Sequence, residues 1–192
     1  MRIIAGEFKG RRLASVKGDI RPTSDKVREA VFSILGPAVL EAKVLDLFAG
    51  TGALSLEALS RGAADAVLVE EQGAALSVLQ KNLDTLGLTE RARVLPLPVA
   101  AALRKLTAQG TQFSLIFLDP PYGRGLALKT LATLQDSGIL SPDARVVAEH
   151  SQRETLPDQV GRLILSHNRR YGDTQVSFYE IRENSTRQEL SG

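Results

Sequence analysis

The sequence predicts an α/β protein built on one mostly parallel, seven-stranded sheet that ends in an antiparallel hairpin. Two observations support this fold class. Short apolar segments alternate with helical segments from about residue 43 to residue 149, and strand, helix and strand in series form parallel sheets covered on both faces. The last two strand patterns, 161–167 and 174–181, have no helix between them, so we expect them to pair antiparallel.

The chain should begin with a basic appendage, residues 1–20. Two short strand-like stretches flank a turn rich in glycine and lysine there, which is typical of a β-hairpin. Thr23 or Ser24 should cap a helix that runs to Leu35, because apolar residues recur at helical spacing until a Gly-Pro pair stops it.

Regular alternation follows this first helix. Strands are predicted at 43–48, 65–70, 92–97, 113–118 and 144–149, and helices near 53–61, 72–86, 99–108 and 125–136. These elements belong to a single domain, 21–182, because 192 residues with 43% hydrophobic content suit one core. The polar stretch 183–192 is predicted to be a disordered tail.

The composition narrows the function. The chain has no cysteine and only two isolated histidines, so thiol chemistry and a metal site are not expected. With no long apolar run and no signal segment, we expect a cytoplasmic protein that does not bind membranes. Residues 1–28 carry eight Lys or Arg against three acids, which suggests an anionic partner such as nucleic acid, with a solvated charged face as the alternative.

One motif, FLDPPYG at 117–123, ends a predicted buried strand. Asp119 stands at the end of the strand, and Pro120 and Pro121 lack N–H groups, so the loop presents acceptors with few donors. Such a loop suits a ligand that donates hydrogen bonds. Tyr122 adds a flat face on which a base can stack.

A second motif joins a strand to a helix through a loop of small residues. Ser55 stands where a dinucleotide-binding loop has its third glycine, so a dinucleotide is disfavoured. Glu70 ends the next strand and can accept both ribose hydroxyls, with Glu71 as the alternative. Asp46 precedes the loop and would repel a pyrophosphate, so a ribose-containing cation, S-adenosylmethionine, is the predicted cofactor. The expected cofactor contacts in and before the loop are Asp46, Phe48, Ala49, Gly50, Thr51 and Gly52.

Four segments resemble one family, the bacterial 16S ribosomal-RNA guanine-N2 methyltransferases (RsmD-like), which are class I S-adenosylmethionine-dependent enzymes. These segments are RPTSDKVREAVFSIL at 21–35, DLFAGTG at 46–52, DPPY at 119–122 and RYGDT at 170–174. The resemblance covers almost the whole chain and implies the Rossmann-like fold of class I methyltransferases.

The resemblance also implies roles for individual residues. Thr23 would close over the amino-acid end of the cofactor, and Asp46, Gly50, Gly52 and Glu70 would hold it. Asp119, Pro120 and Tyr122 would handle the base, with Asp119 also close to the cofactor. Relatives usually carry an acid after the third strand; this chain has Leu97-Pro98-Val99 there, which leaves the Val99 N–H for the adenine ring.

The predicted reaction is methyl transfer to the exocyclic N2 of a guanine in 16S ribosomal RNA, within the small ribosomal subunit or an assembly intermediate. Arg11, Arg12 and Arg21 are the expected RNA contacts, and the protein should act as a monomer. Two alternatives stay open: an adenine-N6 DNA or RNA methyltransferase, which would use the same core, and a non-catalytic RNA-binding module, which would explain only the basic start.

Overall fold

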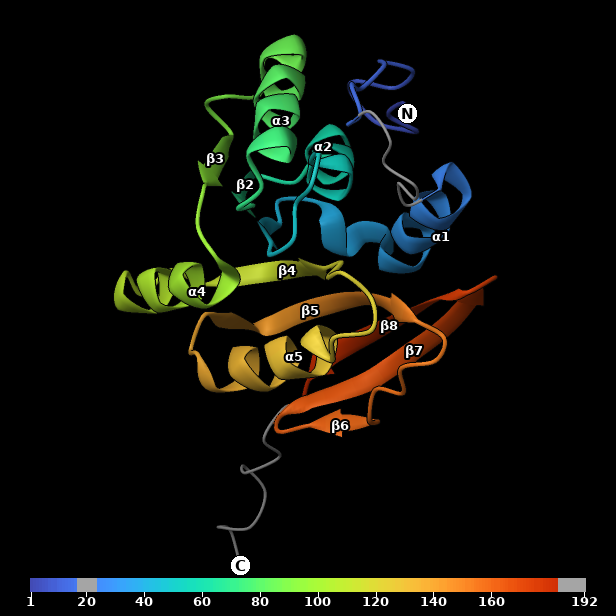
Figure 1. Ribbon diagram of the computed structural model, residues 1–192, viewed down its shortest axis with the longest axis vertical. Helices are drawn as coiled ribbons and strands as arrows, with labels where there is room; N and C mark the ends of the chain where they lie inside the picture. Colours follow the sequence, from blue (N-terminus) through green and yellow to red (C-terminus); the bar gives the residue numbers. More distant parts are fainter. Residues whose placement is uncertain (17–23, 183–192) are drawn as a thin grey trace, which may run out of the picture.

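The structure is a computed structural model that describes residues 1–16 and 24–182 (Figure 1). The strands form one sheet in the order β3-β2-β1-β4-β5-β8-β7-β6. Their bounds are β1 Lys43–Asp46, β2 Asp65–Val69, β3 Ala92–Leu95, β4 Phe113–Leu118, β5 Leu140–Ser151, β6 Gln159–Val160, β7 Leu163–Tyr171 and β8 Thr174–Ile181. The helices are α1 Asp25–Leu35, the 3-10 turn η1 Gly36–Val39, α2 Ala53–Ser60, α3 Gly73–Leu86, α4 Val99–Ala108 and α5 Leu126–Asp136.

The pairing of the strands confirms the predicted fold class. The five strands from β3 to β5 pair parallel, whereas β8 runs antiparallel to β5 and β7 antiparallel to β8. The bounds of several strands differ from the prediction, and β5 is longer than the predicted 144–149 at both ends. Two further differences concern the C-terminal strands. The two-residue strand β6 adds an eighth strand at the edge, and β7 continues to Tyr171, so the turn to β8 is only Gly172 and Asp173. Both the presence of β6 and the length of β7 depend on strand pairing across the sheet, which local sequence does not reveal.

Helices cover both faces of the sheet and enclose two apolar layers. The layer under α1, α2 and α3 includes Phe117 and Val147, and the layer under α4 and α5 includes Leu118 and Ala148. Because side chains alternate between faces along a strand, consecutive residues of β4 and β5 supply opposite layers. The C-terminal strands, orange to red in Figure 1, form the end of the sheet farthest from β3.

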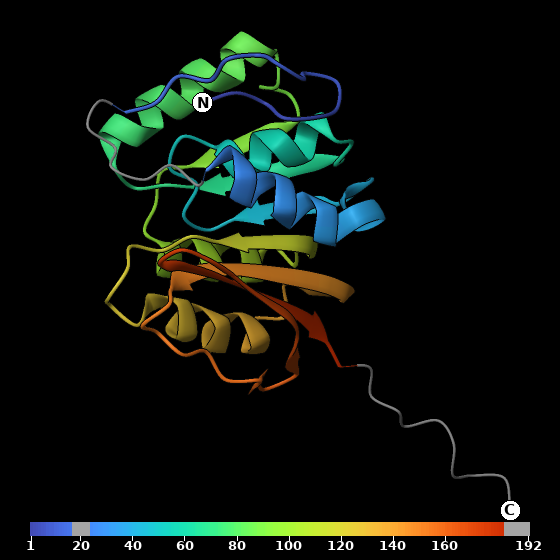
Figure 2. The ribbon, with the colours of Figure 1, turned by 90° about the vertical axis from the view of Figure 1, so that its right-hand side faces the viewer.

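The N-terminal segment, residues 1–16, forms a turn closed by one isolated β-bridge, between Arg2 and Arg12, where we predicted a hairpin. Ile3 and Leu13 are buried in the α1–α3 layer. The segment runs beside α3 (Figure 2). Glu57 of α2 accepts hydrogen bonds from the backbone N–H groups of Ile4 and Ala5, at 2.8 and 3.0 Å. The segment is therefore held by buried polar groups as well as by apolar contact.

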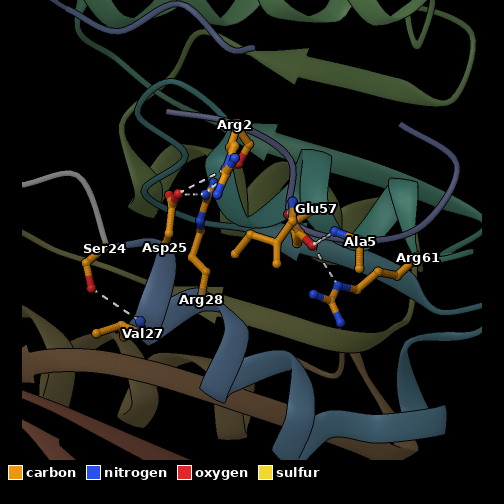
Figure 3. Close-up of polar contacts among 9 residues, drawn as sticks. Arg2, Ala5, Ser24, Asp25, Val27, Arg28, Glu57 and Arg61 are labelled. Carbon is orange, nitrogen blue, oxygen red and sulfur yellow. Dashed lines mark hydrogen bonds and ion pairs between the residues drawn. The ribbon is translucent and has the colours of Figure 1, made fainter. Parts of the chain in front are cut away.

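Close contacts fix the start of α1 as well. The Ser24 Oγ accepts a hydrogen bond from the Val27 N–H at 3.2 Å, which makes Ser24 the N-cap; Thr23, the other predicted cap, lies outside the described residues (Figure 3). Arg28 is fully buried and donates to the Arg2 carbonyl and to Asp25. The first turn of α1 is thus tied to the N-terminal segment.

Candidate functional site

A cleft of about 720 Å³ opens at the carboxyl ends of β1, β2, β4 and β5. Both sequence motifs meet there, as expected for ligand sites in open α/β sheets. The predicted site residues that line it are Asp46, Phe48, Ala49, Gly50, Thr51, Glu70, Val99, Asp119, Pro120, Pro121 and Tyr122. Glu71, the alternative ribose acid, also lines the cleft but is exposed. Arg21 and Thr23 lie outside the described residues.

Acidic residues follow one another across four neighbouring strands. Asp46 ends β1, Glu70 follows β2, and Asp119 follows β4. Glu149 lies in β5 and completes the row. By the alternation of each strand, all four belong to the face that carries α1, α2 and α3. A cleft with this many carboxylates favours a cationic or hydrogen-donating ligand.

The loop after β1 owes its shape to two glycines with positive φ, Gly50 and Gly52. A Cβ on Gly52 would lie 2.5 Å from the Leu79 Cδ1, so Gly52 allows the loop to pack tightly against α3. Gly52 does not line the cleft, and its predicted cofactor contact stays a prediction. Its contribution is the conformation of the loop.

Glu70 holds this loop in place. Its Oε2 accepts a hydrogen bond from the Gly50 N–H at 2.8 Å, and its Oε1 accepts from the N–H groups of Glu71 and Gln72. These bonds orient the carboxylate, which retains acceptor capacity because an ionised carboxylate offers about four lone-pair sites. Glu70 therefore has the position and the chemistry for ribose hydroxyls.

Asp46 is the most deeply buried acid of the row, with 2% of its surface exposed. Its Oδ2 accepts a hydrogen bond from the Ser55 hydroxyl at 2.8 Å, whereas Oδ1 is buried and makes no hydrogen bond to a described residue. Burial raises the pKa of Asp46 to about 7, and the charge of Glu70 adds to the rise; the Ser55 hydroxyl and nearby backbone N–H groups oppose it. An incompletely satisfied buried carboxylate is suited to a cation.

Tyr122 is fixed by two residues that the sequence did not mark as functional, Glu149 and Thr174. The Tyr122 hydroxyl donates to the Glu149 Oε1 at 3.1 Å and lies 3.0 Å from the Thr174 Oγ1. Burial raises the pKa of Tyr122 above its usual value, and the charges of Glu149 and Asp119 add to the rise. Two signals in the sequence pointed to them: Thr174 is the last residue of the RYGDT segment, and Glu149 ends the strand predicted at 144–149.

The predicted RNA contacts of the N-terminal segment stand apart from the cleft. Arg11 and Arg12 are exposed and do not line it. Asn82 of α3 connects the two regions: its side chain bonds the Ala14 N–H and carbonyl and also donates to the Thr51 carbonyl at 3.0 Å. The N-terminal segment is thereby joined to the cofactor loop.

Neither a metal site nor a membrane span is found in the part of the chain that the structure describes. No group of three or more His, Cys, Asp or Glu residues within 1–16 and 24–182 is arranged to hold a metal ion. None of the helices in these ranges has the length and apolar character needed to cross a bilayer.

Known proteins resemble the chain over most of its length. The model of the family described as conserved hypothetical protein 95 matches residues 1–180. The Bacillus subtilis protein YlbH is 42% identical over 184 residues, which cover 95% of this chain and all of that protein. The Ribosomal RNA small subunit methyltransferase D of Escherichia coli strain K12 is 39% identical over 181 residues, 94% of this chain and 89% of the enzyme.

Solved structures share the fold. The structure of yhhF from Escherichia coli superimposes with a TM-score of 0.84 at 39% identity and covers 94% of this chain and 97% of that one. An RNA methyltransferase from Salinibacter ruber in complex with S-adenosyl-L-homocysteine gives a TM-score of 0.64 at 18% identity, over 90% of this chain and all of that one. At that identity the second likeness concerns the fold alone.

Proposed function

The chain belongs to the family described as conserved hypothetical protein 95, and from this premise we propose that it transfers a methyl group from S-adenosylmethionine to the exocyclic N2 of a guanine in 16S ribosomal RNA. A relative that is 39% identical over 94% of this chain is named a ribosomal RNA small subunit methyltransferase. The observation that supports the proposal is that Asp46 and Asp119 line one cleft from adjacent strands: Asp46 pairs with Phe117, two residues before Asp119. A carboxylate suited to a cation thus lies near one suited to an amine.

The residues of the cleft fit the cofactor. Asp46 offers a buried oxygen to the positively charged sulfonium and ammonium groups, and Glu70 offers acceptors to the ribose. Leu97 and Val99 give an apolar wall for the adenine, and Val99 begins α4, where the first N–H groups of a helix have no intrahelical partner. Thr23 would close over the amino-acid end.

Bound S-adenosylmethionine supplies an electrophilic methyl group on sulfur. The amine of guanine is a weak nucleophile because its lone pair is delocalised into the ring. If Asp119 and the Pro120 carbonyl each accept one N–H, the nitrogen moves toward tetrahedral geometry and its lone pair faces the methyl group. With the cofactor bound, the methyl carbon would pass from sulfur to this nitrogen as the sulfur–carbon bond breaks, and Asp119 or water would take the proton that the amine loses.

Asp119 also stabilises the positive charge that develops on the nitrogen, since it is an acceptor already in place before the reaction. Pro121 stiffens the loop that presents these acceptors. The ring of Tyr122 would stack on the base, at roughly 1–3 kcal/mol for such contacts. Its hydroxyl is bonded to β5 and β8, so the ring has a defined orientation before the base arrives.

The RNA would be the substrate within the small subunit or an assembly intermediate, bound by a monomer in the cytoplasm. The target guanine must be unpaired or extruded, because a paired base keeps its amine out of reach. Arg11 and Arg12, exposed on the N-terminal segment, and Arg21 would contact phosphates.

The two alternatives are less well supported. A non-catalytic RNA-binding module does not account for an acidic cleft beside a basic segment, since carboxylates repel phosphates. An adenine-N6 enzyme would use the same acceptors, but the Escherichia coli relative that is 39% identical is named a methyltransferase of small-subunit ribosomal RNA.

The test uses small-subunit particles from a strain that lacks the modification, incubated with the protein and cofactor carrying a labelled methyl group. Digestion of the RNA and identification of the labelled nucleoside, followed by mapping of its position, should give N2-methylguanosine at one site. Label in N6-methyladenosine, or no label in RNA, would contradict the proposal.

A further inference from the structure

Glu149 is a buried carboxylate in the cleft that the proposed mechanism leaves without a substrate contact. It is 9% exposed and lines the same cleft as Asp119 and Tyr122. Burying a carboxylate costs free energy. A neutral acceptor would accept the Tyr122 hydroxyl equally well, so the bond from Tyr122 does not by itself explain a carboxylate at this position. The position of this charge therefore bears on the ligand.

Strand register places Glu149 beside Asp119. Leu118 of β4 pairs with Ala148 of β5 in parallel register. Asp119 directly follows Leu118, and Glu149 directly follows Ala148. The preceding pair, Phe117 and Val147, lies in the layer under α1, so alternation directs both acids to that same face. Adjacent strands are about 4.8 Å apart, which is close enough for two carboxylates to receive neighbouring donors of one ring.

The hydrogen bonds around Tyr122 identify Glu149 as an acceptor. The tyrosine hydroxyl has one proton, which it donates to the Glu149 Oε1. The Thr174 hydroxyl, 3.0 Å away, is then the donor to Tyr122. This order directs donors toward the carboxylate, and a carboxylate can accept further bonds on its remaining lone pairs.

The amino-bearing bases differ in what lies beside their amine. In adenine the atoms that flank the exocyclic amine on its two hydrogen-bonding edges, N1 and N7, are both acceptors. Cytosine has an acceptor, N3, on one side and a carbon on the other. Guanine alone has a ring N–H, at N1, next to its amine. A second carboxylate beside the amine acceptor therefore attracts guanine and repels adenine and cytosine.

We propose that Glu149 determines the choice of base by accepting the N1–H of the target guanine while Asp119 and the Pro120 carbonyl accept its amine. This inference rests on the proposed function, and it supplies a physical basis for guanine that the Asp-Pro-Pro-Tyr motif alone lacks. Tyr122 then supports the base: its ring stacks on the base, and the bond from its hydroxyl to Glu149 holds that ring in place.

The test compares guanine with 2-aminopurine, which keeps the amine but has an acceptor at N1. Small-subunit particles are reconstituted with 16S ribosomal RNA that carries either base at the position mapped by the labelling experiment, and kcat/KM is measured for each. Wild type should prefer guanine. In Glu149→Gln the amide can donate to N1 of 2-aminopurine, so the preference should fall by at least about tenfold, as expected when a hydrogen bond to a charged group is exchanged.

Two variants separate base recognition from simple support of the ring. Tyr122→Phe removes the hydroxyl bond and should slow transfer to both bases while the preference stays within about twofold of its wild-type value. Glu180→Gln makes the same chemical change at a half-buried position of β8, where the side chain pairs with Arg145, and should change neither rate nor preference.

An unchanged preference in Glu149→Gln, or an equal loss of preference in Tyr122→Phe, overturns the inference. Wild type is informative without any variant: transfer to 2-aminopurine at the guanine rate also overturns it. Failure of the proposed function is a different result, because it would show as the absence of N2-methylguanosine when wild type acts on unmodified particles.

Discussion

Asp46 is a single residue whose negative charge suits a cationic ligand but lowers the free energy of unfolding of the cofactor-free protein. Its pKa is raised in the folded protein to about 7, from about 3.9 in an unfolded chain, so the folded state holds a proton on Asp46 between these values. The contribution of Asp46 to stability is thus present below pH 4 and is lost as the pH rises toward 7. Above pH 7 the buried charge destabilises the protein without cofactor.

Asp46→Asn should therefore raise the melting temperature of the cofactor-free protein at pH 8, by about 2–4 °C for each kcal/mol gained. The same change should weaken cofactor binding. In wild type the affinity should fall as the pH drops from 7 to 5.5, because a cation must displace the proton; in the variant it should stay flat over this range. Calorimetric titration at several pH values checks both, and a flat wild-type profile would contradict the role given to Asp46.

Glu70 should matter for cofactor binding through its ribose contacts. Because hydrogen bonds to a charged group contribute roughly 1.5–3 kcal/mol, Glu70→Ala should weaken binding of S-adenosylmethionine by about one to two decades. It should also lower the melting temperature, since three backbone N–H groups lose their acceptor.

Calorimetry and thermal unfolding measure these two effects of Glu70→Ala separately. The matched control is Glu71→Ala, at an exposed neighbour on the same cleft, which should retain affinity. If Glu71→Ala weakens binding and Glu70→Ala does not, the ribose contact belongs to Glu71.

We expect Asp119 to affect the reaction more than cofactor binding. Asp119→Ala should leave cofactor affinity nearly intact and lower the rate of methyl transfer by at least about a hundredfold, which is typical of the loss of one preorganised polar contact. Single-turnover rates with labelled cofactor provide the measurement. Asp136→Ala, at the exposed end of α5, is the control and should behave as wild type. Equal rates for Asp119→Ala and wild type would remove Asp119 from the mechanism.

At the scale of elements, α3 joins the N-terminal segment to the loop between β1 and α2. The buried Asn82 makes three hydrogen bonds, two to Ala14 and one to the Thr51 carbonyl. The side chain therefore aligns two segments that lie 37 residues apart in sequence, from Ala14 to Thr51. A shift of the N-terminal segment would therefore move Asn82 and, through it, the loop that lines the cleft.

Asn82→Ala should lower the free energy of unfolding by about 1–3 kcal/mol, because buried backbone groups lose their partners. It should also weaken cofactor binding, since the loop at Thr51 is no longer held. Urea unfolding and calorimetric titration test the two effects. Asn168→Ala, at an exposed position of β7, serves as the control. A variant with wild-type affinity would show that the loop keeps its shape without α3.

At the scale of the whole molecule, charge is divided between two surfaces. The cleft is acidic, whereas the N-terminal segment bears exposed arginines that do not reach it. An RNA that is held by its phosphates on the basic segment would present an uncharged base to the acidic cleft. This division favours a long polyanion with one extruded base over a free nucleotide.

Replacement of Arg11 and Arg12 by alanine should weaken RNA binding and reduce its salt dependence. Each lost phosphate contact should lower the slope of log K against log salt by about 0.7–0.9. Cofactor affinity should not change. Filter binding over a range of salt concentrations gives the slope, and the control replaces Arg104 and Lys105, two exposed cations on α4. A slope equal to that of wild type would show that Arg11 and Arg12 do not contact RNA and belong to a solvated charged face.

The sequence by itself determined the features that depend on local chemistry. Alternation of apolar segments predicted the parallel sheet, small residues predicted the ligand-binding loop after β1, and prolines marked the acceptor loop after β4. Each of these features depends on neighbouring residues, because backbone conformation and the alternation of side chains between faces are set over a few positions. The family resemblance likewise rests on short contiguous segments.

Only the tertiary structure decided which distant side chains meet. Tyr122 bonds Glu149 and Thr174, which are 27 and 52 residues away, and strand register alone brings Glu149 beside Asp119. Asn82 could not be identified as a link for the same reason. Hydrogen bonds between separate elements depend on pairing and packing of the whole sheet, and no local pattern encodes them; the residue that we infer to read the base therefore became visible only in the fold.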